Sequence, residues 1–220
     1  MEDGLDRIVR DYAATLDDED FTSGLMEVPK FTLITVISDL LSIYMRDRRS
    51  PFLRKFTTVS VAGYTYTDTE EGYDGMKYKE GESPEYCYAM PQNVGIDGWG
   101  KLNGGGIFRL YTWERFRKDE EENPNILTSG FVEGRLVFIY EFPFRCIRER
   151  LREQLKRIFP DGDIPGQYLR SASFTFKHYK DCPDLRCVYV LPPFNLMEYR
   201  EYLTGVLFEA LLKESKKTWG

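Results

Sequence analysis

The stretch from Phe131 to Phe142 constrains the fold more than any other part of the chain, because it predicts a strand that is buried on both faces. Leu136 and Phe138 fall on one face of such a strand, and Val137 and Ile139 fall on the other. A strand with two apolar faces needs a covering layer on each side. We therefore expect this strand at the centre of a sheet that helices flank.

Further strands are predicted where residues alternate and are rich in Thr, Val, Tyr and Phe. Two of the later ones should form a hairpin around the turn from Asp181 to Asp184, which contains a proline. Long loops full of glycine separate the earlier strands. The predicted strands cover residues 55–67, 85–90, 107–116, 171–179 and 185–191.

Apolar residues at helical spacing predict four helices. The second should follow Pro29 and end at Pro51, although its β-branched residues leave a strand as the alternative over 32–37. The last should open at Asn195, which fits an N-cap. The other two cover residues 3–16 and 144–159.

The order of these elements predicts an α+β fold, because the strands come in a run without the strict strand-helix alternation of parallel sheets. We expect a mainly antiparallel sheet of about five to six strands flanked by helices. No repeat or low-complexity linker divides the chain, so a single domain should cover residues 1–220. Residues 1–20 are able to form a helical N-terminal arm.

Composition and termini predict where the protein acts. The longest apolar run, Phe31 to Met45, is interrupted by polar residues and falls short of a membrane span. The first residues are acidic and lack the basic and apolar regions of a secretory signal. We therefore expect no membrane span and a cytoplasmic or nuclear location.

The four cysteines, Cys87, Cys146, Cys182 and Cys187, are too few and too scattered for a disulfide scaffold. We expect reduced thiols, although Cys182 and Cys187 could face each other across the predicted hairpin. A metal site would need two more ligands, and the chain has one histidine. We therefore expect neither a metal ion nor a cofactor.

No stretch carries a catalytic signature. His178 falls in a predicted strand with Phe174 and Phe176 on its face, which indicates a structural histidine and not a general base. The glycines of residues 98–106 precede a strand and lack the phosphate-loop pattern, so they should serve turns. The sequence leans against an enzyme but does not decide the question.

The third predicted helix is strongly basic in a chain whose formal net charge is −6. Between Arg145 and Arg157 six basic residues stand against two acidic ones, and helical spacing aligns several on one face. Trp99, in a glycine-rich loop, either folds back on the sheet or anchors a partner. The candidate contacts for an acidic or anionic protein partner are Arg145, Arg148, Arg152, Lys156 and Trp99.

A second basic segment supports an alternative: a nucleic-acid-binding or phosphodiester-processing protein that uses carboxylates in place of histidine. If the two basic segments converged, the aromatic residues of neighbouring strands could stack on bases; these are Tyr64, Tyr66, Tyr111 and Trp113. An isoelectric point near 5.1 weakens this alternative, because an acidic chain repels polyanions. The candidate nucleic-acid contacts are Arg46, Arg48, Arg49, Arg54 and Lys55.

The closing residues MEYREYLTGVLFEALLKESKKTW resemble the last helix of rhabdovirus matrix proteins, and ISDLLSIYMRDRR is similar to a helix near their start. The resemblance covers these two short amphipathic segments, while the basic tail and the proline-rich motif of that family are missing. It keeps a viral assembly or accessory protein among the candidate functions. We therefore expect a non-catalytic interaction or assembly protein, and self-association is compatible with it.

Overall fold

The computed structural model of the chain describes residues 23–46, 51–67, 72–80, 85–96 and 98–220. The strands are β1 (Thr65–Tyr66), β2 (Gly75–Lys79), β3 (Glu85–Ile96), β4 (Gly106–Tyr111), β5 (Asn125–Val132), β6 (Arg135–Pro143), β7 (Leu169–Phe174) and β8 (Arg186–Val190). The helices are α3 (Lys30–Arg46), α4 (Pro51–Val61), α5 (Trp113–Glu122), α6 (Arg148–Ile158), α7 (Pro193–Glu198) and α8 (Gly205–Trp219). Three short 3-10 turns are η1 (Phe144–Cys146), η2 (Phe176–His178) and η3 (Arg200–Tyr202).

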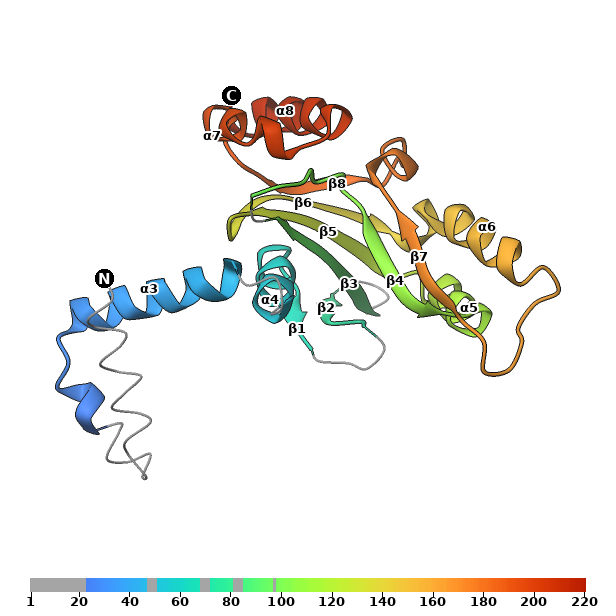
Figure 1. Cartoon of the computed structure of the whole chain (residues 1–220), viewed down its shortest axis with the longest axis horizontal. Helices are drawn as coiled ribbons and strands as arrows, with labels where there is room; N and C mark the ends of the chain where they lie inside the picture. The colour runs from blue at the N-terminus through green and yellow to red at the C-terminus, as the bar shows by residue number, and fades with distance from the viewer. Residues whose placement is uncertain (1–22, 47–50, 68–71, 81–84, 97) are drawn as a thin grey trace.

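These elements form an α+β fold with two sheets (Figure 1). The larger sheet has six strands in the order β1-β2-β3-β5-β6-β8, and all neighbours are antiparallel except the parallel pair β3 and β5. The smaller sheet pairs β4 with β7 antiparallel. The expected fold class, a mainly antiparallel sheet flanked by helices, is confirmed.

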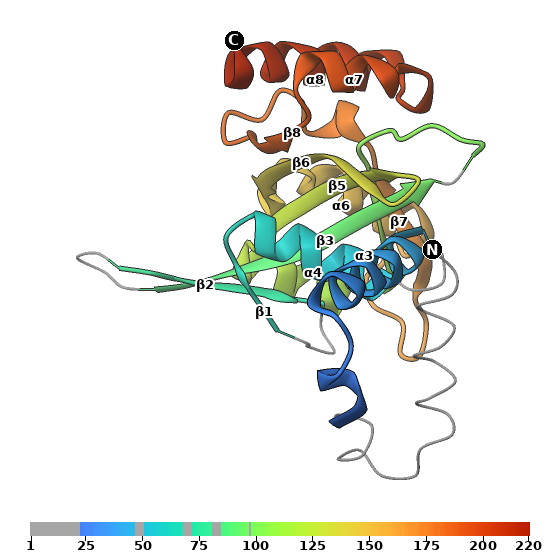
Figure 2. The same ribbon diagram turned by 90° about the vertical axis from the view of Figure 1, so that its left-hand side faces the viewer.

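Alternate residues of β5 divide the core between the two faces of the large sheet. Leu127 packs in a small cluster with Val59 of α4 and Ala89 of β3. Ile126 belongs to the larger cluster, which also holds Phe174 of β7 and residues of α6 and α8. The helix α4 therefore covers one face, and the small sheet with α6 covers the other; Figure 2 shows α4 in front of β3 and β5.

The predicted central strand is divided between two strands, since β5 ends at Val132 and β6 begins at Arg135. Glu133 and Gly134 both have positive φ, of 48° and 80°, and form the tight turn that joins β5 to β6. The strand β6 pairs with β5 on one side and with β8 on the other. Val137, Phe138 and Ile139 are buried, so the prediction of burial on both faces is confirmed.

The predicted strand over residues 55–67 is wrong, because α4 occupies most of it and only Thr65–Tyr66 pairs as β1. Thr58, Val59 and Ala62 are buried along one side of the helix. The Thr58 hydroxyl donates a 2.8 Å hydrogen bond to the carbonyl oxygen of Arg54, one turn earlier. This bond satisfies the hydroxyl of a β-branched residue inside a helix. Tertiary contacts thus override the preference of Thr58 for a strand.

The predicted hairpin of residues 171–179 and 185–191 does not form. The strand β7 pairs with β4, whereas β8 pairs with β6, so the two segments join different sheets. Between them His178 lies in η2 and not on a strand. The predicted strand 107–116 likewise stops at Tyr111, because the Thr112 hydroxyl accepts a hydrogen bond from the backbone N–H of Arg115 and caps α5.

The predicted helix after Pro29 is confirmed as α3, whose apolar residues Phe31, Ile34, Ile37 and Leu41 are exposed. The last predicted helix is two helices, and the first of them begins at Pro193 instead of Asn195. The predicted helix 3–16 and the N-terminal arm 1–20 lie outside the described residues. In the part of the chain that the structure describes, none of the helices has the length and apolarity of a membrane span.

Candidate partner-binding surface

The basic helix is confirmed as α6, and its inner side is fixed to the small sheet. Leu151 and Leu155 are buried in the main core. The Gln154 side chain accepts a 3.0 Å hydrogen bond from the Ser173 N–H of β7 and donates one of 3.0 Å to the Ser173 carbonyl oxygen. These two hydrogen bonds to β7 fix the rotation of α6 about its axis, so the basic side of the helix faces outward.

The outward guanidinium groups of α6 form an ion-pair network. Arg152 lies 2.8 Å from a carboxylate oxygen of Glu120 on α5 and 3.0 Å from one of Glu149. Arg148 lies 3.4 Å and 3.1 Å from the same two carboxylates. Glu120 stands in an acidic run, but no spacing along the chain connects it with the arginines of α6.

Two of the predicted contacts, Arg145 and Arg148, line a hollow of about 460 Å³, here called the disulfide hollow. Lys177 and His178 of η2 line it too, together with Asp181, Cys182 and Asp184 of the following loop. A 2.7 Å ion pair joins the Arg145 guanidinium to the Asp184 carboxylate. The hollow thus brings predicted basic residues beside Lys177, which no sequence pattern had connected with them.

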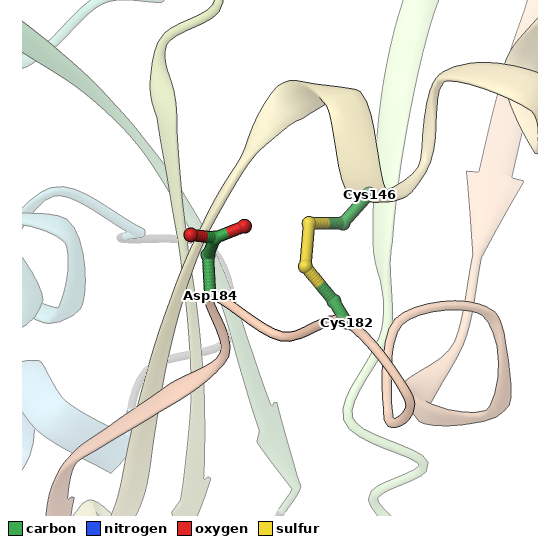
Figure 3. Close-up of side chains that lie close together, drawn as sticks. All are labelled: Cys146, Cys182 and Asp184. Carbon is green, nitrogen blue, oxygen red and sulfur yellow. A yellow bond between two sulfur atoms is a disulfide. The ribbon is translucent and has the colours of Figure 1, made fainter.

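Cys146 and Cys182 form a disulfide that borders this hollow, so the prediction of reduced thiols is wrong for this pair (Figure 3). It joins η1 to the loop before β8 across 36 residues of sequence. Cys87 and Cys187 are free, and the suggested pairing of Cys182 with Cys187 does not occur. The true pairing depends on how the loop docks on η1, which no local spacing reveals.

The disulfide also bears on metal binding. Within the described ranges, Cys146, Cys182 and Asp184 are the group whose ligand atoms lie close enough to hold a metal ion, within 4.8 Å of one another. Zinc binds cysteine as a thiolate, and sulfurs bonded to each other do not offer thiolates. In its disulfide form the group therefore does not fit a zinc ion.

His178 has a structural role, although not in the predicted strand. Its Nδ1 accepts a 2.9 Å hydrogen bond from the Thr175 N–H and completes a capping box at the start of η2. Burial lowers the pKa of the imidazole, which favours the neutral ring. The Nδ1 atom is thus engaged by Thr175, which gives this histidine a structural role at the edge of the hollow.

The two described residues of the second basic segment, Arg54 and Lys55, do not join the first. Arg54 is only 5% exposed, and the Lys55 ammonium lies 3.1 Å from the buried Asp74 carboxylate. Both belong to α4, on the opposite face of the large sheet from α6. Tyr64 and Tyr111 are buried and cannot stack on bases. Arg48, Arg49 and the side chain of Arg46 lie outside the described residues.

Trp99 is 96% exposed and does not fold back on the sheet. Positive φ values at Gly98 and Gly100 shape the loop around it. Leu102 ends the loop in the core, where its N–H donates a 2.8 Å hydrogen bond to the Tyr202 carbonyl oxygen. A fixed loop base with an exposed indole matches the expected partner anchor, which stays a prediction.

No protein-family model matches the chain, and no curated protein matches it significantly.

Proposed function

We propose that the chain is a non-catalytic interaction protein that binds an acidic protein partner. The contact region, here called the basic surface, consists of Arg145, Arg148, Arg152, Lys156 and Lys177. The observation that carries the proposal is that Arg145, Arg148 and Lys177 come from two separate segments and line one hollow. A concave surface with several cations and a polar rim suits the side chains of an acidic partner.

The carboxylates near the basic surface are compatible with binding. Asp184, Glu120 and Glu149 form ion pairs with three of the arginines. Such exposed ion pairs are each worth about 0–1 kcal/mol, so a partner carboxylate replaces them at small cost. Lys177 and Lys156 have no ion pair within the described residues and add cationic charge that is not neutralised. Association should weaken as salt screens these charges.

The test compares two double variants with the same change of charge. Arg145→Glu with Lys177→Glu alters the disulfide hollow, and Lys101→Glu with Lys216→Glu alters exposed lysines outside it. Fluorescence anisotropy measures binding to a Glu-rich peptide and to a single-stranded oligonucleotide of equal formal charge. We expect the first variant to lose at least about tenfold in peptide affinity and the second to stay within about twofold. Equal losses would contradict the proposal.

The oligonucleotide arm tests the nucleic-acid alternative. Tighter binding of the oligonucleotide than of the peptide would favour that alternative, with the larger salt dependence that phosphate contacts cause. Sedimentation of the same samples tests self-association. A viral assembly or accessory role is a further part of the proposal and is supported by the resemblance of two helical segments. A cytoplasmic or nuclear location is supported by the acidic first residues, whereas the Cys146–Cys182 disulfide favours an oxidising compartment.

A further inference from the structure

A second hollow, of about 510 Å³, lies between β8 and α8 and shares no lining residue with the disulfide hollow. This β8–α8 hollow has one wall from α8, one from the loop and first residues of β8, and an aromatic floor from β6 and η2. Its volume is in the range of small-molecule sites, about 300–1,000 Å³. The residues that carry the argument are Tyr140, Lys180, Arg186, Lys213, Glu214 and Lys217.

The β8–α8 hollow is cationic in a chain with a net charge of −6. Four basic side chains line it, against the single carboxylate of Glu214. Arg186 is paired with Glu141, and Lys217 lies 3.9 Å from Glu214. Lys180 lies 3.5 Å from the exposed Asp181, and Lys213 has no ion pair in the described part of the chain. Exposed ion pairs such as those of Lys180 and Lys217 are worth only about 0–1 kcal/mol, so an anion is able to replace their carboxylates and to bind Lys213 as well.

The floor of this hollow is lined by a tyrosine, Tyr140, whose side chain is otherwise buried. Tyr140 is 2% exposed, and its ring stacks on Phe176 with the centroids 5.4 Å apart. The hydroxyls of Tyr64, Tyr111 and Tyr179 each donate to an acceptor in the protein. Within the described residues, the Tyr140 hydroxyl has no such partner. This hydroxyl is therefore able to donate a hydrogen bond to a ligand in the hollow.

We propose that the β8–α8 hollow binds a small organic phosphate. Tyr140 donates a hydrogen bond to a phosphate oxygen at the floor, while Lys180, Lys213 and Lys217 contact the remaining oxygens from the two walls. A phosphate monoester carries about −1.5 to −2 charges and three acceptor oxygens, which matches several donors converging from different directions. A carboxylate, with one charge and two oxygens, would leave part of this set unused. The site is independent of the basic surface.

Three variants test the assignment, by isothermal titration with inorganic phosphate, pyrophosphate and AMP. Lys213→Glu reverses a lining charge, and Lys216→Glu makes the same change on an exposed position of α8 that does not line the hollow. Tyr140→Phe removes only the hydroxyl. We expect saturable binding of AMP to the wild type, a loss of at least about tenfold for Lys213→Glu and of about three- to tenfold for Tyr140→Phe, and a change within about twofold for Lys216→Glu.

Tyr140→Phe also separates ligand binding from folding. Because the hydroxyl bonds to no group in the described part of the protein, we expect this variant to melt at the wild-type temperature in the absence of ligand. Four results would each overturn the assignment: no saturable heat with any of the three probes, equal losses for the two lysine variants, unchanged affinity of Tyr140→Phe, or tighter binding of inorganic phosphate than of AMP.

Discussion

The Tyr111 hydroxyl donates a 2.9 Å hydrogen bond to the carboxylate of Asp119, and both residues are buried. The second carboxylate oxygen accepts a 2.7 Å bond from Tyr73 and one of 2.7 Å from the Arg115 Nε. A buried charge is stable only when it is paired and hydrogen-bonded. These three donors meet that condition and join α5 to β4 and to the segment before β2.

We predict that Asp119→Ala lowers the free energy of unfolding by about 3–5 kcal/mol. The variant leaves Tyr73, Tyr111 and Arg115 without their buried acceptor. Urea unfolding followed by circular dichroism measures the change. Glu121→Ala, at an exposed position of the same helix, is the matched control and should stay within about 0.5 kcal/mol of the wild type. Similar values for the two variants would contradict this account.

Substitution by alanine should change the stability of the protein in opposite directions at Gly105 and Gly205. A Cβ at Gly105 would overlap the backbone carbonyl oxygen of Phe174, which cannot move without shifting β7. A Cβ at Gly205, the first residue of α8, would meet nothing within 4 Å. We expect Gly105→Ala to cost about 1–3 kcal/mol and Gly205→Ala to stabilise the protein by about 0.4–1 kcal/mol. Thermal unfolding of the two variants decides the point.

The disulfide should stabilise the fold because it lowers the conformational entropy of the unfolded chain. Closing a loop of this length is worth about 2–4 kcal/mol, so a reducing agent should lower the melting temperature of the wild type by roughly 5–15 °C. Cys146→Ser should melt at the lower temperature with or without the reducing agent. An unchanged melting temperature of the reduced wild type, in which thiol labelling shows that the disulfide is open, would refute the contribution of the disulfide to stability.

Stability should fall at alkaline pH. Burial is the main cause that raises the pKa of Tyr64, Tyr73, Tyr111, Tyr140 and Tyr179 above the usual 10, and burial raises the pKa of Cys187 from 9.0 to about 12. Above pH 9 to 10 the unfolded chain releases these protons while the folded protein keeps them. The free energy of unfolding therefore falls as the pH rises further.

The free energy of unfolding should therefore be flat with respect to these groups up to about pH 8.5, and should then decline by up to about 1.4 kcal/mol per pH unit for each group. Urea unfolding at several pH values measures the decline. Phenolate absorbance should show these buried tyrosines ionising only as the protein unfolds. Complete ionisation of the folded protein near pH 10, without loss of stability, would contradict the expected shift.

Much of the sheet and the basic helix could be predicted from the sequence. Val137 and Phe138 lie on opposite faces of one strand, and this pattern alone indicates burial on both sides. The spacing of Leu151 and Leu155 likewise predicts α6 with Arg148 and Arg152 outside. Elements whose apolar pattern has a clear period were therefore predictable from local sequence.

The rest depends on contacts between distant segments. Thr58 and Val59 favour a strand by propensity, but packing against Ala89 and Leu127 makes their segment a helix. The ion pair of Arg152 with Glu120 joins two helices that lie far apart in the sequence, and the disulfide of Cys146 with Cys182 joins η1 to the loop before β8. No spacing along the chain encodes such pairs.

Capture of a partner by the basic surface is the most direct test of the proposed function. Tagged wild type, Arg145→Glu with Lys177→Glu, and Lys101→Glu with Lys216→Glu are incubated with native extract, with and without nuclease, and washed at low and high salt. We predict a protein partner that resists nuclease, is released by high salt, and is lost only from the first double variant. Retention of that partner by the first variant, or its disappearance on nuclease treatment, would contradict the account.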